Sequence, residues 1–474
     1  MLAGRISKEI EKSVAFIPAQ KVFAAKNLSV KSIWIVYLLS TSGLCAFFIY
    51  KYISEYLKYN VSSQIDWINI NRLDFPIITL CQPNYQDTLY IELANQLFQN
   101  ISKEDSDITD SYFIRYFGRK ISYKTLINKN RNQTETIPIS TFLLSCIFSA
   151  KNCFNEFEYF YDFYYGNCYT FNSAKAKYST QTGVFNGFQL QLYIDDTSSV
   201  NTIFSIENGF KIFINRHKNN FNLMTEGIQI APGFMTNIAL SKYTIKQVPF
   251  PYSKCIDNLN SFDSYNSIIY KKIFGFKKFY DYFSCKLLCF QKLVGSKCKC
   301  QHVISKQYYY ENMRTCEQQD EVCALTAWFD FSANFDVINE CDCPIECISV
   351  GYTATTSISD YPTKFYADNI LSQIPLIISK FQDKSKMTYE NIRKRVVSVN
   401  VYYDELKETV IEHEIKMSAF DLFSSIGGIL SLFIGLSLLS FIEFFEILIM
   451  ILFQNKKISN NNNNNDKNIT KINK

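Results

Sequence analysis

The chain has 474 residues, of which 47% are hydrophobic, and it carries 15 cysteines and a net charge of +5. This length allows two or three folded units, and 41 Phe and 32 Tyr hold too much apolar area for a disordered protein. The small net charge gives no basic footprint for nucleic acid, which is excluded as a partner. Fifteen cysteines beside three histidines argue against a cytosolic enzyme, because reducing compartments rarely carry such a thiol surplus except as metal ligands.

The first apolar run extends from Ser32 to Tyr50 without a charge and is bounded by Lys31 and Lys51. Its 19 residues span roughly 28 Å at about 1.5 Å each, close to the thickness of the hydrocarbon core. A cleaved signal peptide, the alternative, would have a shorter apolar core and a small-residue cleavage site. We therefore predict a cytoplasmic N-terminus over residues 1–31 and a transmembrane helix over residues 32–51.

The second apolar run extends from Leu422 to Phe453, uncharged as far as Ile442, with only Glu443 and Glu446 in the remainder. It is long enough to cross a bilayer obliquely or with a break. No other uncharged stretch approaches this length between the two runs. We predict a second transmembrane helix over residues 421–453 and a cysteine-rich extracellular domain over residues 52–420.

Orientation follows from Lys and Arg near the spans, because positive charge is retained on the cytoplasmic side. The flanking basic residues are Arg5, Lys8, Lys12, Lys21, Lys26 and Lys31 before the first span, and Lys456, Lys457, Lys467, Lys471 and Lys474 after the second. Both termini are therefore predicted to be cytoplasmic in a plasma-membrane protein. The Asn-rich run from Asn460 predicts a disordered tail over residues 454–474.

Cysteine usage agrees with this orientation. Cys45 lies in the first span, and the other 14 cysteines, from Cys81 to Cys347, all fall in the predicted extracellular part, where an even number suits seven disulfides. Zinc is the competing interpretation, but only His302 lies nearby. We therefore expect no metal and no other cofactor. In the same part, Asn60, Asn100 and Asn132 open N-x-S/T acceptors and are candidate glycosylation sites of a glycoprotein.

The extracellular part reads as a mixed α/β unit. Residues 75–81 predict a short buried strand, and alternation predicts half-buried strands of an antiparallel sheet over residues 186–195, 209–217 and 235–248. Apolar spacing from Ser264 to Val294 suits helices, and residues 396–406 alternate again before the second span. Residues 110–160 show no clear periodicity.

Two cysteine spacings constrain the helical part. Cys285 and Cys289 are four apart, which places both on one helix face, whereas Cys341 and Cys343 are two apart, as on one face of a strand. A helix face can be joined to a strand in this way. Cys298 and Cys300 repeat the shorter spacing, and Cys316 and Cys323 could serve them.

A stripe of small and polar residues follows the second span: Asp421, Ser424, Gly428, Ser431 and Gly435 recur at spacings of three and four, which is one helical face. Such a stripe must face other helices or water, because lipid would leave its polar groups unpaired. One interpretation is a helix-packing seam, with Gly427 and Gly428 allowing close contact. The other is a pore, in which a glycine lets the helix unwind so that backbone carbonyls line a water-filled path.

The stripe continues to Glu446, with Glu443 beside it. Repeated by symmetry, these carboxylates would form cation-attracting rings at the inner mouth of a pore. The alternative is a solvated pair at the headgroup level.

The chain resembles the epithelial sodium channel, degenerin and acid-sensing ion channel family from span one to span two. The motifs that carry the resemblance are Phe75-Pro76 with Thr79-Leu80-Cys81, Pro251-Tyr252 before Cys255, the Cys285 to Cys300 spacing, Asn400-Val401-Tyr402-Tyr403, and Gly435-x-Ser437. The resemblance implies a trimeric sodium-preferring channel, homomeric or heteromeric, with two transmembrane helices flanking a disulfide-rich ectodomain. It implies a selectivity filter at Gly435, Leu436 and Ser437, and a gate position at Ser424.

The resemblance also implies a disulfide pairing. The pairs are Cys81 with Cys168, Cys146 with Cys153, Cys255 with Cys347, Cys285 with Cys343, Cys289 with Cys341, Cys298 with Cys323, and Cys300 with Cys316.

The sequence departs from the family in two places: no His-Gly dipeptide precedes the first span, and Leu436 stands where the family usually has a smaller residue. Three other functions compete: a two-span ecto-enzyme, a non-conducting receptor and an ATP-gated trimeric channel. The ectodomain lacks the glycine-rich phosphate loops and the G-x-S-x-G motif that an ecto-enzyme would need. The polar stripe discriminates further, since a mere membrane anchor does not require it.

Overall fold

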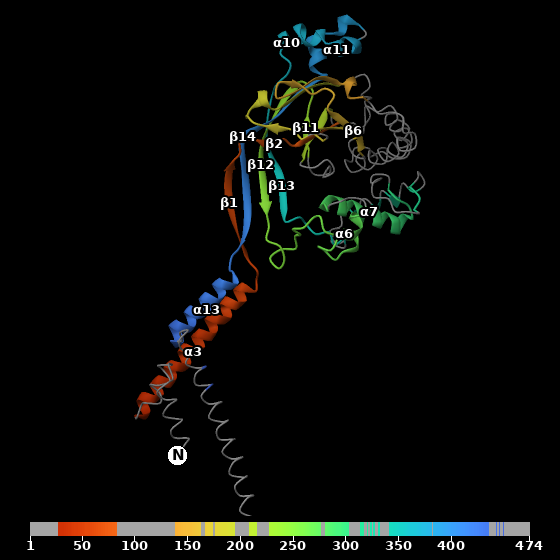
Figure 1. Cartoon of the computed structure of the whole chain (residues 1–474). Coiled ribbons are helices and arrows are strands. Elements are labelled where there is room, and N and C mark those ends of the chain that lie inside the picture. Colours follow the sequence, from red (N-terminus) through yellow and green to blue (C-terminus); the bar gives the residue numbers. More distant parts are fainter. Residues whose placement is uncertain are drawn as a thin grey trace, which may run out of the picture. The chain divides into compact units, whose positions relative to one another are not determined.

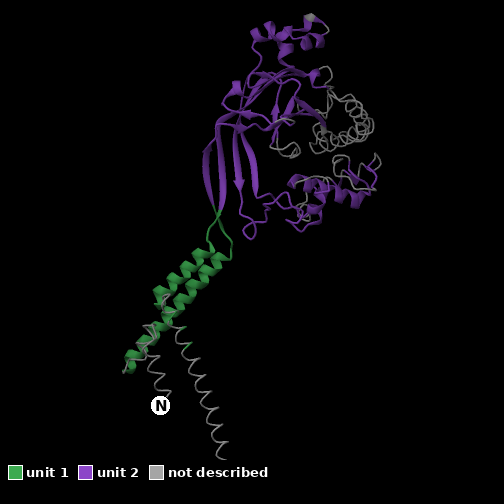
Figure 2. Cartoon of the chain, in the orientation of Figure 1, with its two compact units in different colours: residues 1–62, 414–474 green, residues 63–413 purple. Residues whose placement is uncertain are grey.

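The computed structural model describes most of the chain outside residues 1–26, 83–137 and 450–474. The described residues are 27–82, 138–162, 166–173, 176–194, 208–215, 227–275, 280–302, 313–316, 320, 323–324, 326–327, 330–331, 341–381, 383–435, 442, 445 and 449. They fall into two compact units, one formed by residues 1–62 with 414–474 and the other by residues 63–413 (Figure 2).

The first unit holds two apolar helices that lie side by side (Figure 2). Helix α3 (Leu28–Tyr56) contains the first predicted span and is, in the described part of the chain, the one helix long and apolar enough to cross a membrane. Helix α13 (Ala419–Ile434) is apolar but has 16 residues, about 24 Å. It ends at Gly435, whose φ of 77° is left-handed and stops the helix without a Cβ clash.

The second unit is built on a seven-stranded mixed sheet (Figure 1). Its strand order is β13-β12-β14-β9-β4-β5, with β1 also paired to β14. The strands are β1 (Val61–Asn69), β4 (Leu143–Phe148), β5 (Lys151–Asn152), β9 (Phe188–Tyr193), β12 (Phe234–Lys246), β13 (Ile348–Asp360) and β14 (Val396–Ile415).

A five-stranded sheet with the order β11-β10-β3-β7-β6 shares the core with the first sheet. Its strands are β3 (Ile77–Gln82), β6 (Phe157–Asp162), β7 (Gly166–Phe171), β10 (Phe210–Asn215) and β11 (Ile228–Ile230), and a separate ladder joins β2 (Leu73–Asp74) to β8 (Tyr178–Ser179). The ring of Phe171 stacks on that of Phe188 at 4.3 Å, which joins β7 to β9 across the core. All six residues of β3 are buried, as predicted for residues 75–81.

The expected single antiparallel sheet is wrong, although its three strands exist. Strand β10 belongs to the five-stranded sheet, and β12 pairs with β14 in parallel from Met235↔Ser398 onward. Alternation of apolar and polar residues predicts which face of a strand is buried, but it carries no information on the partner strand or its direction.

The helices predicted in Ser264–Val294 are α6 (Ile268–Ile273) and α7 (Tyr282–Cys298). Asp281 caps α7, because its Oδ1 accepts from the backbone N–H of Ser284 at 2.8 Å. The helix ends at Lys299 in a left-handed conformation with a φ of 56°. Its buried face includes Leu288 and Phe290, so burial of this face and the disulfides described below hold α7 in place.

A small helical cluster follows β13, with a buried core of Ala367, Leu371, Ile377 and Ile392. It comprises α10 (Lys364–Asn369), α11 (Pro375–Lys380) and α12 (Tyr389–Arg393) with the 3₁₀ turns η6 (Leu371–Gln373) and η7 (Lys384–Lys386); two more 3₁₀ turns are η2 (Ile139–Thr141) and η3 (Val184–Asn186).

Candidate pore helix and its supporting frame

Helix α13 begins with a capping box that the sequence analysis overlooked. The hydroxyl of Ser418 accepts from the backbone N–H of Asp421 at 3.1 Å, and the Asp421 carboxylate accepts from the backbone N–H of Ser418 at 2.9 Å. The spacing Ser-x-x-Asp is a recognisable signature of this motif. Asp421 therefore fixes where the helix starts, a structural role beside the pore-lining role predicted for it.

The face of α13 that packs on α3 is apolar. Leu422, Ile426, Ile429 and Phe433 are half-buried, and the ring of Phe433 stacks on Phe48 of α3 at 5.6 Å. Phe433 and Phe48 belong to the same unit, so this contact settles which side of α13 its own chain covers.

The polar stripe lies on the other side. Asp421, Ser424, Gly428, Ser431 and Gly435 are all exposed in the isolated chain. A Cβ built on Gly427, Gly428 or Gly435 would meet no atom within 4 Å. Packing of these glycines against α3 therefore does not explain the stripe, which is left open to water or to another chain.

The predicted filter is only partly within the described residues. Gly435 is its last described residue, and Leu436 and Ser437, with Glu443 and Glu446, lie outside them. The left-handed conformation of Gly435 ends the helical hydrogen bonding at the position where the sequence predicts a break.

Seven disulfides join the 14 cysteines from Cys81 to Cys347, the number that the sequence predicts. The bonded pairs are Cys81–Cys168, Cys146–Cys153, Cys255–Cys347, Cys285–Cys343, Cys289–Cys341, Cys298–Cys323 and Cys300–Cys316, the same pairs that the family resemblance implies. Cys45 is reduced and buried in α3. Cys255, Asp257 and Cys347 bring sulfur and oxygen atoms within 4.8 Å of one another, but the two sulfurs share a disulfide and are not thiolate ligands.

The partner segment of α7 is not the strand that the spacing of Cys341 and Cys343 predicted. Asp342 between them has a left-handed φ of 49°, and the segment is irregular. The tyrosine hydroxyl of Tyr265 donates to the Asp342 carboxylate at 2.6 Å, which holds this turn. Both cysteines still reach the helix, since Cys343 is bonded to Cys285 and Cys341 to Cys289.

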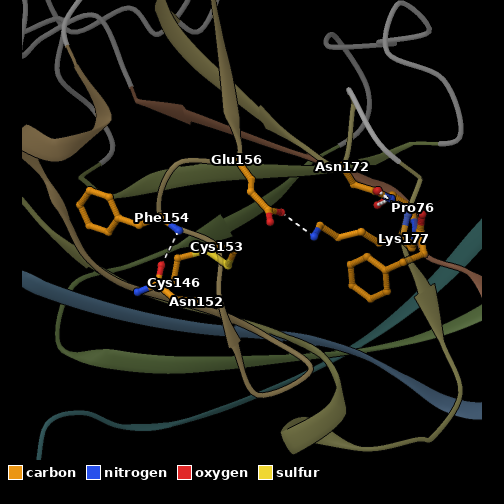
Figure 3. Close-up of polar contacts among 9 residues, drawn as sticks. Pro76, Cys146, Asn152, Cys153, Phe154, Glu156, Asn172 and Lys177 are labelled. Carbon is orange, nitrogen blue, oxygen red and sulfur yellow. Dashed lines mark hydrogen bonds and ion pairs between the residues drawn. A yellow bond between two sulfur atoms is a disulfide. The ribbon is translucent and has the colours of Figure 1, made fainter.

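The segment that contains Phe75 and Pro76 is held by Asn172, which follows β7 (Figure 3). Its amide Nδ2 donates to the carbonyls of Phe75 and Pro76 at 2.6 and 3.2 Å, and its Oδ1 accepts from the backbone N–H of Lys177 at 2.7 Å. Asn172 has a φ of 67°, a conformation that asparagine tolerates better than most residues. The sequence alone gives no signal for this contact, which fixes the Phe75-Pro76 motif.

Lys177 also forms an ion pair with Glu156 at 2.5 Å, close to the Cys146–Cys153 disulfide (Figure 3). Its ammonium lies 5.3 Å from the ring centre of Phe148. The pair therefore links the turn after β5 to the residue before β8, and the backbone carbonyl of Lys177 in turn accepts from the N–H of Phe75 at 2.8 Å.

Strand β14 leads through Lys416–Ser418 into α13, and a bulge interrupts its pairing with β12 between Leu240 and Lys242. Below the bulge, Lys242 forms an ion pair with Glu408 at 3.3 Å, and both side chains are about 15% exposed or less. Thr244 also donates to Glu408. This largely buried pair joins β12 to the strand that precedes the candidate pore helix, and no local sequence pattern indicates it.

The buried His302 predicts a pH dependence of stability. Burial lowers the pKa of His302 to about 3 from 6.5, and its ring packs edge-on against Phe290 of α7. Because the unfolded state takes up the proton first, this stability is fully present above pH 6.5 and is lost as the pH falls toward 3. We expect a loss of about 2 kcal/mol between pH 7.5 and pH 5, measured as reduced hydrogen-exchange protection of residues 282–298.

The variant His302→Phe is the control for this prediction. It cannot take up a proton, and the backbone bonds between residue 302 and Gln291, at 2.6 and 2.8 Å, do not involve the ring. An equal pH dependence in His302→Phe would assign the effect to another group.

The chain combines a disulfide-rich domain with one helix long and apolar enough to cross a membrane and a second helix with a polar stripe, the arrangement expected of a membrane channel subunit. The family model for the amiloride-sensitive sodium channel matches residues 18–447. The chain belongs to the amiloride-sensitive sodium channel family, whose members are ion channels and not enzymes.

Three relatives illustrate the match. Acid-sensing ion channel 1A of Danio rerio is 24% identical over 452 residues, covering 90% of this chain and 84% of that protein. Acid-sensing ion channel 1 of Gallus gallus is 26% identical, covering 90% and 80%. Epithelial sodium channel subunit beta of Canis lupus familiaris is 26% identical, covering 74% and 53%. Among solved structures, a proton-activated chloride channel aligns with 90% of this chain and all of that chain at a TM-score of 0.29 and 9% identity, from which nothing follows for this chain.

Proposed function

We propose that this chain is a subunit of a sodium-preferring cation channel that carries sodium passively across the plasma membrane. The observation that carries the proposal is the direction of the polar stripe on α13. Its apolar face packs on α3 through Phe433, while Ser424, Gly428 and Ser431 are exposed. In a bilayer such a stripe needs water or other copies of the same helix around it.

The same reasoning supports several α13 helices around one pore, and we propose the trimer that the family resemblance implies, assembled from identical or related chains. We infer that the second span covers residues 421–453 and crosses with a break after Gly435, since α13 alone is about 24 Å long and shorter than the hydrocarbon core. With residues 32–51 as the first span, residues 1–31 and 454–474 lie in the cytoplasm and residues 52–420 outside. Asn60, one of the candidate glycosylation sites, lies in this outer part. Its side-chain amide donates to the carboxylate of Glu55 at 3.0 Å.

At the filter, Gly435, Leu436 and Ser437 would present backbone carbonyls to the ion, and Glu443 and Glu446 would place negative charge at the inner mouth. Selectivity for cations over anions follows from the negative charge of these two carboxylates. Sodium over potassium depends on the ring geometry, which Leu436 can widen, so we expect a sodium preference weaker than in the epithelial channels.

Cysteine accessibility tests the direction of the stripe. Single cysteines at Ser424, Gly428 and Ser431 should react with a water-soluble thiol reagent in the open channel and reduce the current, because water reaches that face. A cysteine at Leu430, half-buried and off the stripe, should react at least tenfold more slowly, since a reagent must first leave water. Whole-cell current before and after the reagent is the measurement, and the unmodified chain, with Cys45 buried, gives the background. Equal rates at Leu430 and Ser431 would rule out the pore-facing stripe.

A further inference from the structure

Strand β13 forms one end of the seven-stranded sheet, next to β12 (Figure 1). Its antiparallel register with β12 runs without a shift from Phe234↔Asp360 to Lys246↔Ile348. The strand is 13 residues long and carries no charge from Ile348 to Ser359. Native edge strands are usually protected against further pairing by charges, prolines, bulges or short length. Strand β13 has none of these before Asp360.

Hydrogen bonds at its two ends show which backbone groups point away from β12. The N–H of Tyr361 donates to the carbonyl of Gly233 at 3.0 Å, and the N–H of Gln247 donates to the carbonyl of Cys347 at 2.8 Å. In the register of this ladder these are pairs of directly opposite residues, so the odd-numbered residues of β13 bond to β12. Ala354, Thr356 and Ile358 therefore direct their N–H and C=O groups outward.

These outward groups are exposed in the isolated chain. Every residue from Thr353 to Asp360 is exposed, and the side chain of Ile358 is 71% exposed. Within the part of the chain that the structure describes, no backbone hydrogen bond reaches the outward groups of Ala354, Thr356 or Ile358. The eight exposed residues span about 26 Å, the length of a short extended peptide.

The C-terminal end of this edge carries a charge, Asp360, that can select the orientation of an added strand. Asp360 is paired through Oδ1 with Arg393 at 2.7 Å, and its side chain remains 76% exposed. A carboxylate can accept more than one donor through its second oxygen. A strand added antiparallel to β13 would begin opposite Asp360, so its free terminal ammonium would lie beside this carboxylate.

We propose that the free edge of β13 from Thr353 to Asp360 binds an extended, uncharged peptide segment with a free amino terminus, which adds as an antiparallel strand. Backbone bonds to Ala354, Thr356 and Ile358 supply the binding, and Asp360 fixes the direction. Every second side chain of the peptide would lie opposite Ile358, Thr356 and Ala354, an uncharged row that favours uncharged residues. This binding does not depend on ion conduction.

Hydrogen exchange of the full-length protein in detergent tests the proposal. The probe is a synthetic peptide with the sequence of Phe234–Ser241, which is uncharged and already fits β13 from its other edge. Without peptide, the amides of Ala354, Thr356 and Ile358 should exchange freely while those of Thr353, Thr355 and Ser357 are protected. With peptide in excess, the three outward amides should slow at least tenfold.

Two changes separate edge binding from other effects. Thr356→Pro removes one outward N–H and leaves the β12 ladder intact, so it should weaken peptide binding at least tenfold while protection of Thr355 and Ser357 is unchanged. Acetylation of the peptide removes its terminal ammonium, and Asp360→Asn removes the carboxylate; each change should weaken binding severalfold. The two changes combined should weaken binding no more than either alone, because both remove the same charge pair. Outward amides already protected without peptide would mean that a second copy covers the edge. That result, or free amides with no response to the peptide, would overturn the proposal.

Discussion

Removing both disulfides between α7 and the turn at Cys341–Cys343 is expected to unfold α7 under conditions where the rest of the ectodomain stays folded. Either bond alone closes a loop of more than 50 residues, with separations of 58 and 52. When one of the two bonds is already present, the second bond closes only a short ring. That ring consists of the residues from Cys285 to Cys289 and those from Cys341 to Cys343. Loop entropy then predicts a cost of about 2 kcal/mol for the first bond lost and about 4 kcal/mol for the second.

The measurement is hydrogen exchange across Tyr282–Cys298 in Cys→Ser variants of the full chain, because local opening is resolved there even when global unfolding is not two-state. The single-bond variants should retain most protection, and the variant lacking both should lose it. The matched control is loss of Cys146–Cys153, which closes a separation of only 7 and should leave α7 unchanged. Equal effects of one and two lost bonds would contradict the loop argument.

Replacing Gly435 by alanine is expected to abolish most of the sodium preference. The φ of 77° at Gly435 is unfavourable for any residue with a Cβ, by about 1 to 2 kcal/mol. A helix that continues past residue 435 would remove this strain, and in the proposed channel it would also remove the backbone carbonyls that the filter presents to the ion. Without that carbonyl ring the pore has no groups that discriminate between the two ions, so sodium and potassium should permeate about equally in Gly435→Ala. A tenfold change in permeability ratio corresponds to about 1.4 kcal/mol.

Reversal potentials under sodium, potassium and chloride substitution measure this. Gly427→Ala is the matched control, because it lies inside α13 and its Cβ would meet no atom within 4 Å, so selectivity should stay unchanged. Leu436→Ala is a companion variant, and unchanged selectivity there would show that this side chain points away from the ring. A current that follows chloride in the unmodified chain would remove the cation-channel proposal itself.

Some elements of the structure could be predicted from the sequence and others could not. The charge-free run in α3 and the buried strand β3 were predictable, because burial in lipid or in a core demands uninterrupted apolar residues. The face of α7 that carries Cys285 and Cys289 followed from helical period alone. The irregular turn at Asp342 did not, because a two-residue spacing fits a strand and a left-handed turn equally well.

By itself, the sequence determined the number of disulfides, the long apolar helix α3 and the stripe on α13, because cysteine number, apolar runs and helical period are all readable from local composition. Only the tertiary structure decided that the stripe faces away from α3, that β12 and β14 run parallel, and that Lys242 meets Glu408. These features depend on pairs of residues far apart in the chain. No local preference specifies which distant surface a helix face or strand edge meets, because that choice is made by packing of the whole core.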